Sequence, residues 1–228
     1  MAMLTVALTG GIATGKSVVA KILEQHGCYA HSADRVAHDL MKPGRPVWQK
    51  IVSHFGRQIL NPDQTINRSG LGGIVFSDEK ERQFLNSLVH PLVLKKKKRV
   101  IRRLDKNGKH KIFISEAALT IESGFVPFFD KVIVVHCAEN VQIQRLMTRD
   151  NISRSEALKK IRSQMPSQEK RRYADYAIDT SGSLEDTVRQ TEDVYQHLLF
   201  DYRRKLQKEK RKSNPRSKLR VRRPKEES

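Results

Sequence analysis

Residues 5–17 decide the fold, and they read Thr5-Val6-Ala7-Leu8-Thr9-Gly10-Gly11-Ile12-Ala13-Thr14-Gly15-Lys16-Ser17. The apolar run at 5–8 predicts a fully buried strand. The stretch from Gly10 to Ser17 fits the pattern G-x-x-x-x-G-K-[ST] without a mismatch. Apolar residues then recur at helical spacing as far as Leu23, and Gly27 supplies a stop. Strand, glycine-rich turn and helix in this order indicate a phosphate-binding loop, or P-loop.

The chemistry of such a loop explains its spacing. Backbone N–H groups can wrap around a β-phosphate only where glycines let the chain turn tightly, and the following helix N-terminus adds partial positive charge. Lys16 is expected to reach the β/γ oxygens, and the Ser17 hydroxyl to hold Mg²⁺. The sequence therefore predicts a site for a nucleoside triphosphate at Gly11, Ile12, Ala13, Thr14, Gly15, Lys16, Ser17 and Val18.

The rest of the chain alternates strand and helix patterns without internal repeats. Further core strands are expected at 28–31, 111–115, 131–136 and 176–179, and helices at 16–25, 140–149, 155–164 and from Leu184. This order predicts an α/β fold, a doubly wound parallel sheet of the P-loop NTPase type. We expect residues 1–200 to form one P-loop domain, and its size favours a kinase of small molecules.

The region 34–107 interrupts the alternation and is mostly helical, so we expect an inserted lobe there. Short helices are predicted at 35–41, 47–55 and 71–76, between breaks rich in proline and glycine. Asp78 with Glu81 has the spacing of a capping box and opens a long helix. Pro91 should kink that helix, and Asn107-Gly108 should end it.

Asp34 follows the second expected strand, at the sheet edge where ligands bind in such folds. A carboxylate at that place can take a proton from, or orient, a hydroxyl that attacks a γ-phosphate. Asp34 could equally cap the following helix. Position alone leaves both interpretations open.

Arg145 and Arg149 lie four residues apart on one expected helix face, and Arg154 follows a short turn. Arginines gathered late in the chain suit a lid, about residues 145–165, that closes over transferring phosphates. An arginine pair on a helix is also common as plain solvated surface.

Charge is concentrated at the end of the chain. The 228 residues carry a formal net charge of +19, and residues 201–228 hold 13 Lys or Arg against 4 Asp or Glu. This basic C-terminal extension has few apolar side chains, so we expect a helix to about Lys212 and disorder from about residue 213. Its expected partner is a polyanion, bound non-specifically.

Several classes of protein are excluded by composition. No run approaches the ~18 apolar residues of a membrane span, and the N-terminal segment lacks the features of a secretory signal. Cys28 and Cys137 have no metal-ligand spacing, so we expect two reduced core thiols in a cytoplasmic protein without membrane partners.

Over about residues 3–200 the sequence resembles the dephospho-coenzyme A kinase family. The elements that carry the resemblance, in chain order, are Ala7–Ile12 leading into the P-loop, Ala33-Asp34, His90-Pro91-Leu92, Arg145, Arg149-Asp150, Gln164, Ala174–Ile178 and Gly182-Ser183. The resemblance implies transfer of the ATP γ-phosphate to the ribose 3′-hydroxyl of dephospho-CoA, with ATP and Mg²⁺ as cofactors.

The resemblance also implies roles for individual residues. Asp34 would be the base for the hydroxyl, with Lys16 and Arg149 catalytic beside it and Arg145 binding ATP. The lobe containing His90 would bind the pantetheine end of dephospho-CoA.

This sequence departs from the family pattern at several positions. Ala13 stands where Gly is usual, Val18 where Thr is usual and Ser32 where a first Asp is usual, and Asp179-Thr180-Ser181 replaces an expected Asn near the base of ATP. Ala13 is acceptable unless its φ is positive. Glu116 follows the third expected strand, where an acid could reach Mg²⁺ through water.

Two other functions fit part of the pattern. One is a P-loop kinase of another small metabolite, because a P-loop does not fix the acceptor. The other is a nucleic-acid-associated NTPase, suggested by the tail and by the basic run Lys95–Arg99. The basic stretches lack the interleaved aromatic side chains that stack on bases, which argues against the second alternative.

Overall fold

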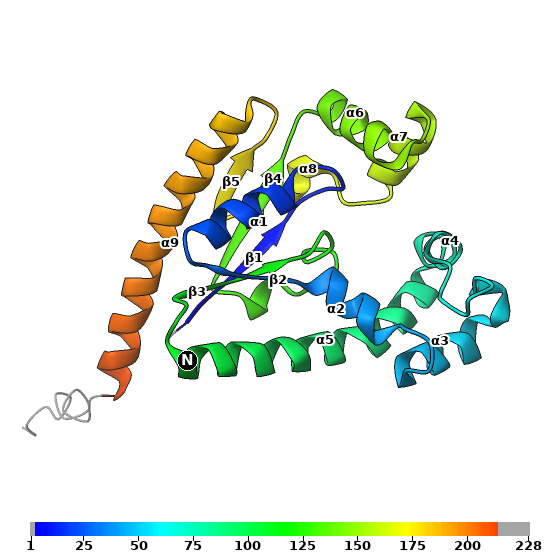
Figure 1. Ribbon diagram of the computed structural model, residues 1–228, viewed down its shortest axis with the longest axis horizontal. Helices are drawn as coiled ribbons and strands as arrows, with labels where there is room; N and C mark the ends of the chain where they lie inside the picture. Colours follow the sequence, from blue (N-terminus) through cyan, green and yellow to red (C-terminus); the bar gives the residue numbers. More distant parts are fainter. Residues whose placement is uncertain (1–2, 214–228) are drawn as a thin grey trace, which may run out of the picture.

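A computed structural model describes residues 3–213 (Figure 1). Its centre is a sheet of five strands in the order β2-β3-β1-β4-β5, and every pairing is parallel. The strands are β1 (Leu4–Thr9), β2 (Tyr29–Ser32), β3 (Ile112–Glu116), β4 (Lys131–His136) and β5 (Tyr176–Asp179). The predicted doubly wound sheet is confirmed, with strand bounds within one residue of expectation.

Helices cover both faces of the sheet. On one face α1 (Lys16–Gln25) and α9 (Leu184–Ser213) bury Leu23 and Leu198 against β1, β3 and β4. On the other face the last turns of α5 (Glu79–Asn107) bury Leu104 against Phe113 of β3. The segment after β3 and the short helix α8 (Ser167–Arg171) complete that second layer. Every central strand is therefore buried on both sides, which explains its continuous apolar sequence.

A helical lobe with its own apolar cluster projects beyond the carboxyl end of β2 (Figure 1). It contains α2 (Ala33–Leu40), α3 (Pro46–Phe55), the 3₁₀ turn η1 (Arg57–Ile59), α4 (Arg68–Ser77) and the first half of α5. The described helices match the expected ones, although α2 begins two residues early and α4 is four residues longer. Because α5 contributes to the apolar cluster of the lobe and to one beside the sheet, it joins the two parts.

The start of α5 differs from the sequence prediction. Asp78 caps the helix as expected, accepting hydrogen bonds from the Lys80 and Glu81 N–H groups. Glu81 does not complete a capping box, because its carboxylate lies 2.6 Å from Nε2 of His54 on α3. Pro91 lies inside α5 without ending it, and the helix ends at Asn107 as predicted.

Two further helices follow β4, α6 (Glu139–Asp150) and α7 (Arg154–Arg162), joined at Asn151 in a left-handed conformation. A second 3₁₀ turn, η2 (Val126–Phe128), precedes β4. Helix α9 reaches Ser213, the last residue described, and is held to the core by Lys205, whose Nζ donates to the Met3 carbonyl and to Asp130. The disorder expected beyond that point lies outside the described residues. Within residues 3–213 no helix has the length and apolar character of a membrane span.

Candidate active site

The P-loop connects β1 to α1 and has the backbone conformation that its glycines allow. Gly10 has a φ of 151°, and a Cβ there would lie 2.1 Å from the Val135 carbonyl oxygen. Gly15 has a φ of 87° and precedes the first turn of α1. Lys16 folds back over the loop, and its Nζ donates to the Gly11 carbonyl at 2.8 Å. The loop therefore presents the α1 N-terminus and one ammonium group to the same space.

Ala13 lies at the turn of the loop with a φ of 59°. That conformation costs an alanine about 1–2 kcal/mol relative to the right-handed region. From the sequence, Ala13 is acceptable only if its φ is not positive, so Ala13 is strained in this loop. Its methyl group packs with Ile12 into the apolar cluster between α6 and α7, which offsets part of this cost. The departure from glycine thus attaches the loop to the helices expected to form the lid.

Two glutamine side chains hold the adjacent peptide of the loop. Gln142 of α6 donates to the Ile12 carbonyl at 2.7 Å, and Gln164 accepts from the Ile12 N–H at 2.8 Å. Gln164 belongs to the resemblance, but Gln142 was missed. Its only signal in the sequence is a polar residue on the buried side of α6, where it is 6% exposed. A buried amide needs partners, and the loop supplies them.

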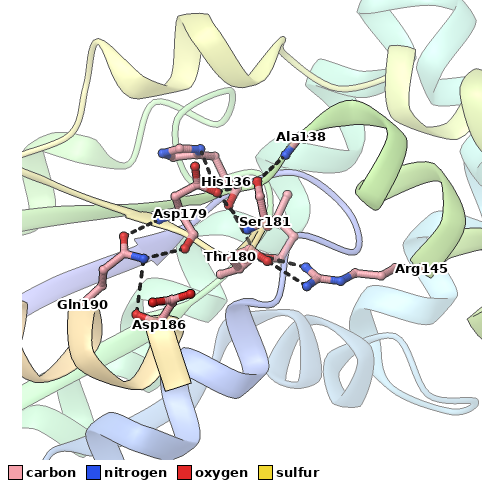
Figure 2. Close-up of polar contacts among 9 residues, drawn as sticks. His136, Ala138, Arg145, Asp179, Thr180, Ser181, Asp186 and Gln190 are labelled. Atoms are coloured by element: carbon pink, nitrogen blue, oxygen red, sulfur yellow. Dashed lines mark hydrogen bonds and ion pairs between the residues drawn. The ribbon is translucent and has the colours of Figure 1, made fainter. Parts of the chain in front are cut away.

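Arg145 reaches from α6 to the turn after β5 (Figure 2). Its guanidinium donates to Oγ1 of Thr180 at 3.0 Å and to the Thr180 carbonyl at 2.7 Å. Thr180 Oγ1 in turn donates to the Thr14 carbonyl of the P-loop at 2.9 Å. With Gly15 and Val18, Arg145 and Thr180 line a cavity of about 240 Å³ beside the α1 N-terminus.

The residues after β5 form a compact polar turn, also shown in Figure 2. Ser181 donates to Asp179 at 2.6 Å and accepts from the Ala138 N–H at 2.8 Å. Gln190 of α9 pairs with both the N–H and the carbonyl of Asp179, as a neighbouring strand would. The sequence Asp179-Thr180-Ser181 therefore makes this turn rigid, although it departs from the family pattern.

Asp34 lies on the first turn of α2, next to the carboxyl end of β2. Ser32 is the cap of that helix, with its Oγ accepting from the Arg35 N–H at 3.3 Å. The alternative interpretation of Asp34 as the cap is therefore wrong, because the preceding serine fills that position. The Asp34 carboxylate is left to accept from the Ala118 N–H and to face the P-loop.

Three charged groups meet at this edge of the sheet: Lys16, Asp34 and Glu116. Strand register brings Glu116 beside Leu8 of β1 and Ser32 of β2. Burial lowers the pKa of Lys16 to about 8, while Asp34 and Glu116 oppose the shift. Burial raises the pKa of Asp34, with the Ala118 N–H, Lys16 and Arg68 opposing it. Burial likewise raises the pKa of Glu116.

Two pockets open on either side of Asp34. One, of about 200 Å³, lies between α2, α5 and the segment 117–125, and His90 lines it. The other, of about 700 Å³, lies between α2 and the η1–α4 segment, with Arg68 and Lys42 among its polar groups. Asp34 lines both, so solvent reaches its carboxylate although protein surrounds it. His90 lies edge-on to Phe125, with ring centroids 4.4 Å apart, and burial lowers its pKa.

Comparison with known proteins gives the same family as the sequence resemblance. The family model for dephospho-CoA kinase matches residues 4–186. The dephospho-CoA kinase of Halalkalibacterium halodurans is 43% identical over 83% of this chain and 94% of its own length. That of Carboxydothermus hydrogenoformans is 43% identical over 81% of this chain and 89% of its own. The chain belongs to the dephospho-CoA kinase family.

Solved structures agree with this family assignment. The dephospho-CoA kinase from Campylobacter jejuni superposes with a TM-score of 0.60 at 30% identity, covering 85% of this chain and 96% of that one. The protein TT1252 from Thermus thermophilus gives a TM-score of 0.72 at 27% identity, with coverages of 86% and 98%. A shikimate kinase from Acinetobacter baumannii, at 15% identity and a TM-score of 0.50, shares the fold alone. This dephospho-CoA kinase family member is therefore a kinase that uses ATP and acts on a small molecule.

Arg149 lies at the end of α6, near the P-loop of this dephospho-CoA kinase family member. Its positive charge is among those that lower the pKa of Lys16. The Nε of Arg149 donates to Asp150 at 2.8 Å, and Lys160 of α7 donates to the same carboxylate at 2.9 Å. Asp150 thus fixes the orientation of Arg149 and joins α6 to α7. Arg145, by contrast, is bound to Thr180 in the turn after β5.

Lys170 is a buried residue near the site that sequence reasoning missed. It is 0% exposed, and its Nζ donates to the Ala118 carbonyl at 2.8 Å and to Glu122 at 2.6 Å. The N–H of the same Ala118 bonds Asp34. Lys170 therefore positions the segment that holds the Asp34 carboxylate. A lysine in a basic run gives no sequence signal that its side chain is buried.

The donors at the sheet edge suit a magnesium ion. Mg²⁺ is usually held by one or two carboxylates together with substrate phosphates and water. The Ser17 side chain is exposed at the start of α1, and the carboxylates of Asp34 and Glu116 lie close enough to Lys16 to affect its pKa. Burial raises the pKa of both carboxyl groups and Lys16 acts against it, so a further cation at this edge would favour their charged forms.

Proposed function

We propose that this chain transfers the γ-phosphate of ATP to an alcohol, the ribose 3′-hydroxyl of dephospho-CoA, giving CoA and ADP. The observation that carries the proposal is the position of Asp34. Its carboxylate faces Lys16 of the P-loop and also lines both pockets of the helical lobe. A hydroxyl held at Asp34 therefore meets the γ-phosphate end of a nucleotide bound at the loop.

The P-loop and the arginines supply the electrostatic part of the reaction. The loop N–H groups and the α1 N-terminus hold the β-phosphate, and Lys16 neutralises charge on the β/γ oxygens. Arg149, oriented by Asp150, binds the transferring group when α6 and α7 close over it. Arg145 with Thr180 forms the floor against which the nucleoside of ATP rests.

The chemical step moves one phosphoryl group and one proton. The ribose 3′-oxygen attacks the γ-phosphorus and forms the new O–P bond, while the bond from that phosphorus to the β–γ bridging oxygen breaks. The proton of the 3′-hydroxyl passes to Asp34, and ADP leaves with the bridging electrons. The raised pKa of Asp34 makes it a stronger base than an ordinary aspartate, and Lys16 helps to keep it ionised.

Ser17, with Glu116 reaching it through water, would hold Mg²⁺. The ion would neutralise charge on the phosphate oxygens. Glu116 follows β3 directly, so its position is fixed by the sheet register rather than by a loop. We also place the protein in the cytoplasm, which is consistent with two free, buried cysteines, Cys28 and Cys137.

Asp34→Asn tests the proposal, with Asp39→Asn as its matched control on the same helix. Asp34→Asn keeps the shape and loses the basicity, so kcat should fall by about 10²–10⁴-fold with little change in ATP affinity. Asp39 pairs with Lys42 on the surface and Asp39→Asn leaves the charge of Lys42 in place, so the variant should keep the wild-type kcat. The measurement is ADP release with MgATP against dephospho-CoA and a panel of other small alcohols. Wild-type kcat in Asp34→Asn, or a better acceptor than dephospho-CoA in the panel, would overturn the proposal.

A further inference from the structure

Lys97 is a buried cation that the proposed chemistry does not use. It lies on α5 two turns after His90, is 6% exposed, and lines the smaller pocket. Among the described residues 3–213 its Nζ forms no hydrogen bond or ion pair with a protein oxygen, and it opens onto the pocket. Its close neighbours are two aromatic rings, with Nζ 4.3 Å from the Phe129 centroid and 5.9 Å from that of Phe125.

Such a group is costly for the fold. Burying an ammonium group without a hydrogen-bond acceptor disfavours its charged form, and burial does lower the pKa of Lys97 to about 8. The two rings return only part of the lost hydration. All four neighbouring basic residues of the run, Lys95, Lys96, Lys98 and Arg99, are exposed on the same helix and carry no such cost. The lining of the pocket thus includes a cationic donor that no protein oxygen satisfies and that is open to a ligand.

The shape of the smaller pocket limits what can supply that acceptor. Its volume is about 200 Å³, somewhat more than the ~150 Å³ cavity that holds a benzene ring. Most of its walls are apolar, and Phe125 and His90 present aromatic rings to it. A diphosphate would lose far more hydration there than a single lysine returns. A flat heteroaromatic base with ring-nitrogen acceptors fits both the walls and the donor.

The order of groups in the acceptor gives the same assignment. The base is attached to the ribose directly, whereas the pantetheine arm is separated from the ribose by the diphosphate. Both pockets begin at Asp34, where the ribose hydroxyl reacts. The larger pocket is lined by the cations Arg68 and Lys42, which suit the diphosphate. The smaller, apolar pocket is then left for the base.

We propose that Lys97 determines acceptor specificity, by donating a hydrogen bond to a ring nitrogen of the acceptor's adenine in the pocket between α2, α5 and residues 117–125. His90 and Phe125 then form the aromatic wall of the base site, so His90 contacts the base rather than the pantetheine arm. This inference rests on the proposed function, since it takes dephospho-CoA as the acceptor. To that function the inference adds the residue that recognises the adenine of the acceptor.

Lys97→Met tests the inference, with Lys98→Met as a control that removes an exposed charge from the same helix. Lys97→Met should raise the KM for dephospho-CoA by about 10–100-fold, which is the worth of one buried hydrogen bond to a charged group. The KM for ATP should stay unchanged, and the melting temperature should not fall, because no carboxylate loses a partner. Lys98→Met should change none of these values. If Lys97→Met does not fold, Lys97→Gln, which keeps an N–H donor, takes its place and should show the smaller loss.

Acceptors with an altered base identify the contact. Dephospho-CoA with 1-deaza-, 3-deaza- or 7-deazaadenine removes one ring nitrogen at a time. One of the three should be a poor acceptor for the wild type and as good as dephospho-CoA for Lys97→Met. An unchanged KM for dephospho-CoA in the variant would overturn the inference. So would an equal rise in KM, caused by Lys97→Met, for dephospho-CoA and for every analogue, because Lys97 would then contact a group that all of them share, such as the diphosphate. If the wild type itself releases no ADP with dephospho-CoA, it is the proposed function that fails.

Discussion

Thr180→Val removes one hydroxyl that ties the P-loop to the rest of the nucleotide site. Thr180 is 3% exposed, and valine has nearly the same shape. The single proton of Oγ1 goes to the Thr14 carbonyl at 2.9 Å, since the His136 carbonyl lies farther away at 3.3 Å. Arg145 loses its 3.0 Å bond to Oγ1 but keeps the 2.7 Å bond to the Thr180 carbonyl. The main loss is therefore the partner of one buried loop carbonyl.

The expected cost follows from that count. A buried polar group left without its partner destabilises a protein by about 1–3 kcal/mol. For a domain of this size, each kcal/mol lowers the melting temperature by about 2–4 °C, so we expect a fall of about 2–12 °C. Because the freed carbonyl belongs to the loop that holds the phosphates, ATP affinity should fall several-fold. The KM for dephospho-CoA should not change, since Thr180 lines neither pocket at Asp34.

Calorimetry and ATP titration check this prediction, with two companion variants. Thr180→Ser keeps the hydroxyl and should restore most of the affinity. Thr191→Val, at a fully buried threonine of α9, removes only a bond to the Thr187 carbonyl within the helix and should leave ATP binding intact. If Thr180→Val melts within about 1 °C of the wild type and binds ATP equally well, the hydroxyl does not hold the loop.

Three further outcomes can be measured. Burial lowers the pKa of Lys16 to about 8, so the charged fraction of Lys16 falls as the pH rises above that value. ATP affinity should therefore weaken between pH 8 and 9. The Lys16→Arg variant should bind ATP without this pH dependence, because arginine stays charged. Arg149→Ala should lower kcat, at a cost of about 2–4 kcal/mol in the transition state, with little loss of ATP affinity. The control Arg154→Ala should change neither kcat nor ATP affinity. Equal losses of kcat and of ATP affinity in Arg149→Ala would make Arg149 a plain binding residue. Truncation after Lys212 should leave kcat and both KM values unchanged but weaken retention on heparin, and a loss of activity at unchanged stability would place the tail in the active site.

The local sequence was sufficient for the P-loop and for the order of the sheet. Glycines at positions 10 and 15 are needed because the chain turns there at positive φ, and the apolar runs of β1, β3 and β4 predict strands buried on both faces. Asp34 could be placed near the P-loop, since it follows a strand whose carboxyl end lies at the same edge of the sheet. These features depend on residues within one or two elements, which is why a pattern can carry them.

The tertiary structure decided which distant residues complete the site. Glu116 joins Asp34 only through the register of β3 with β1 and β2, and Gln142 reaches Ile12 across 130 residues of chain. The clearest case is the lysine run Lys95–Lys98, in which the sequence cannot distinguish one residue from the next. The rotation of α5 against the sheet and segment 117–125 buries Lys97 and leaves its neighbours in water. Burial is a property of what packs on a helix, so only the folded chain separates the solvated charges of this run from the buried one.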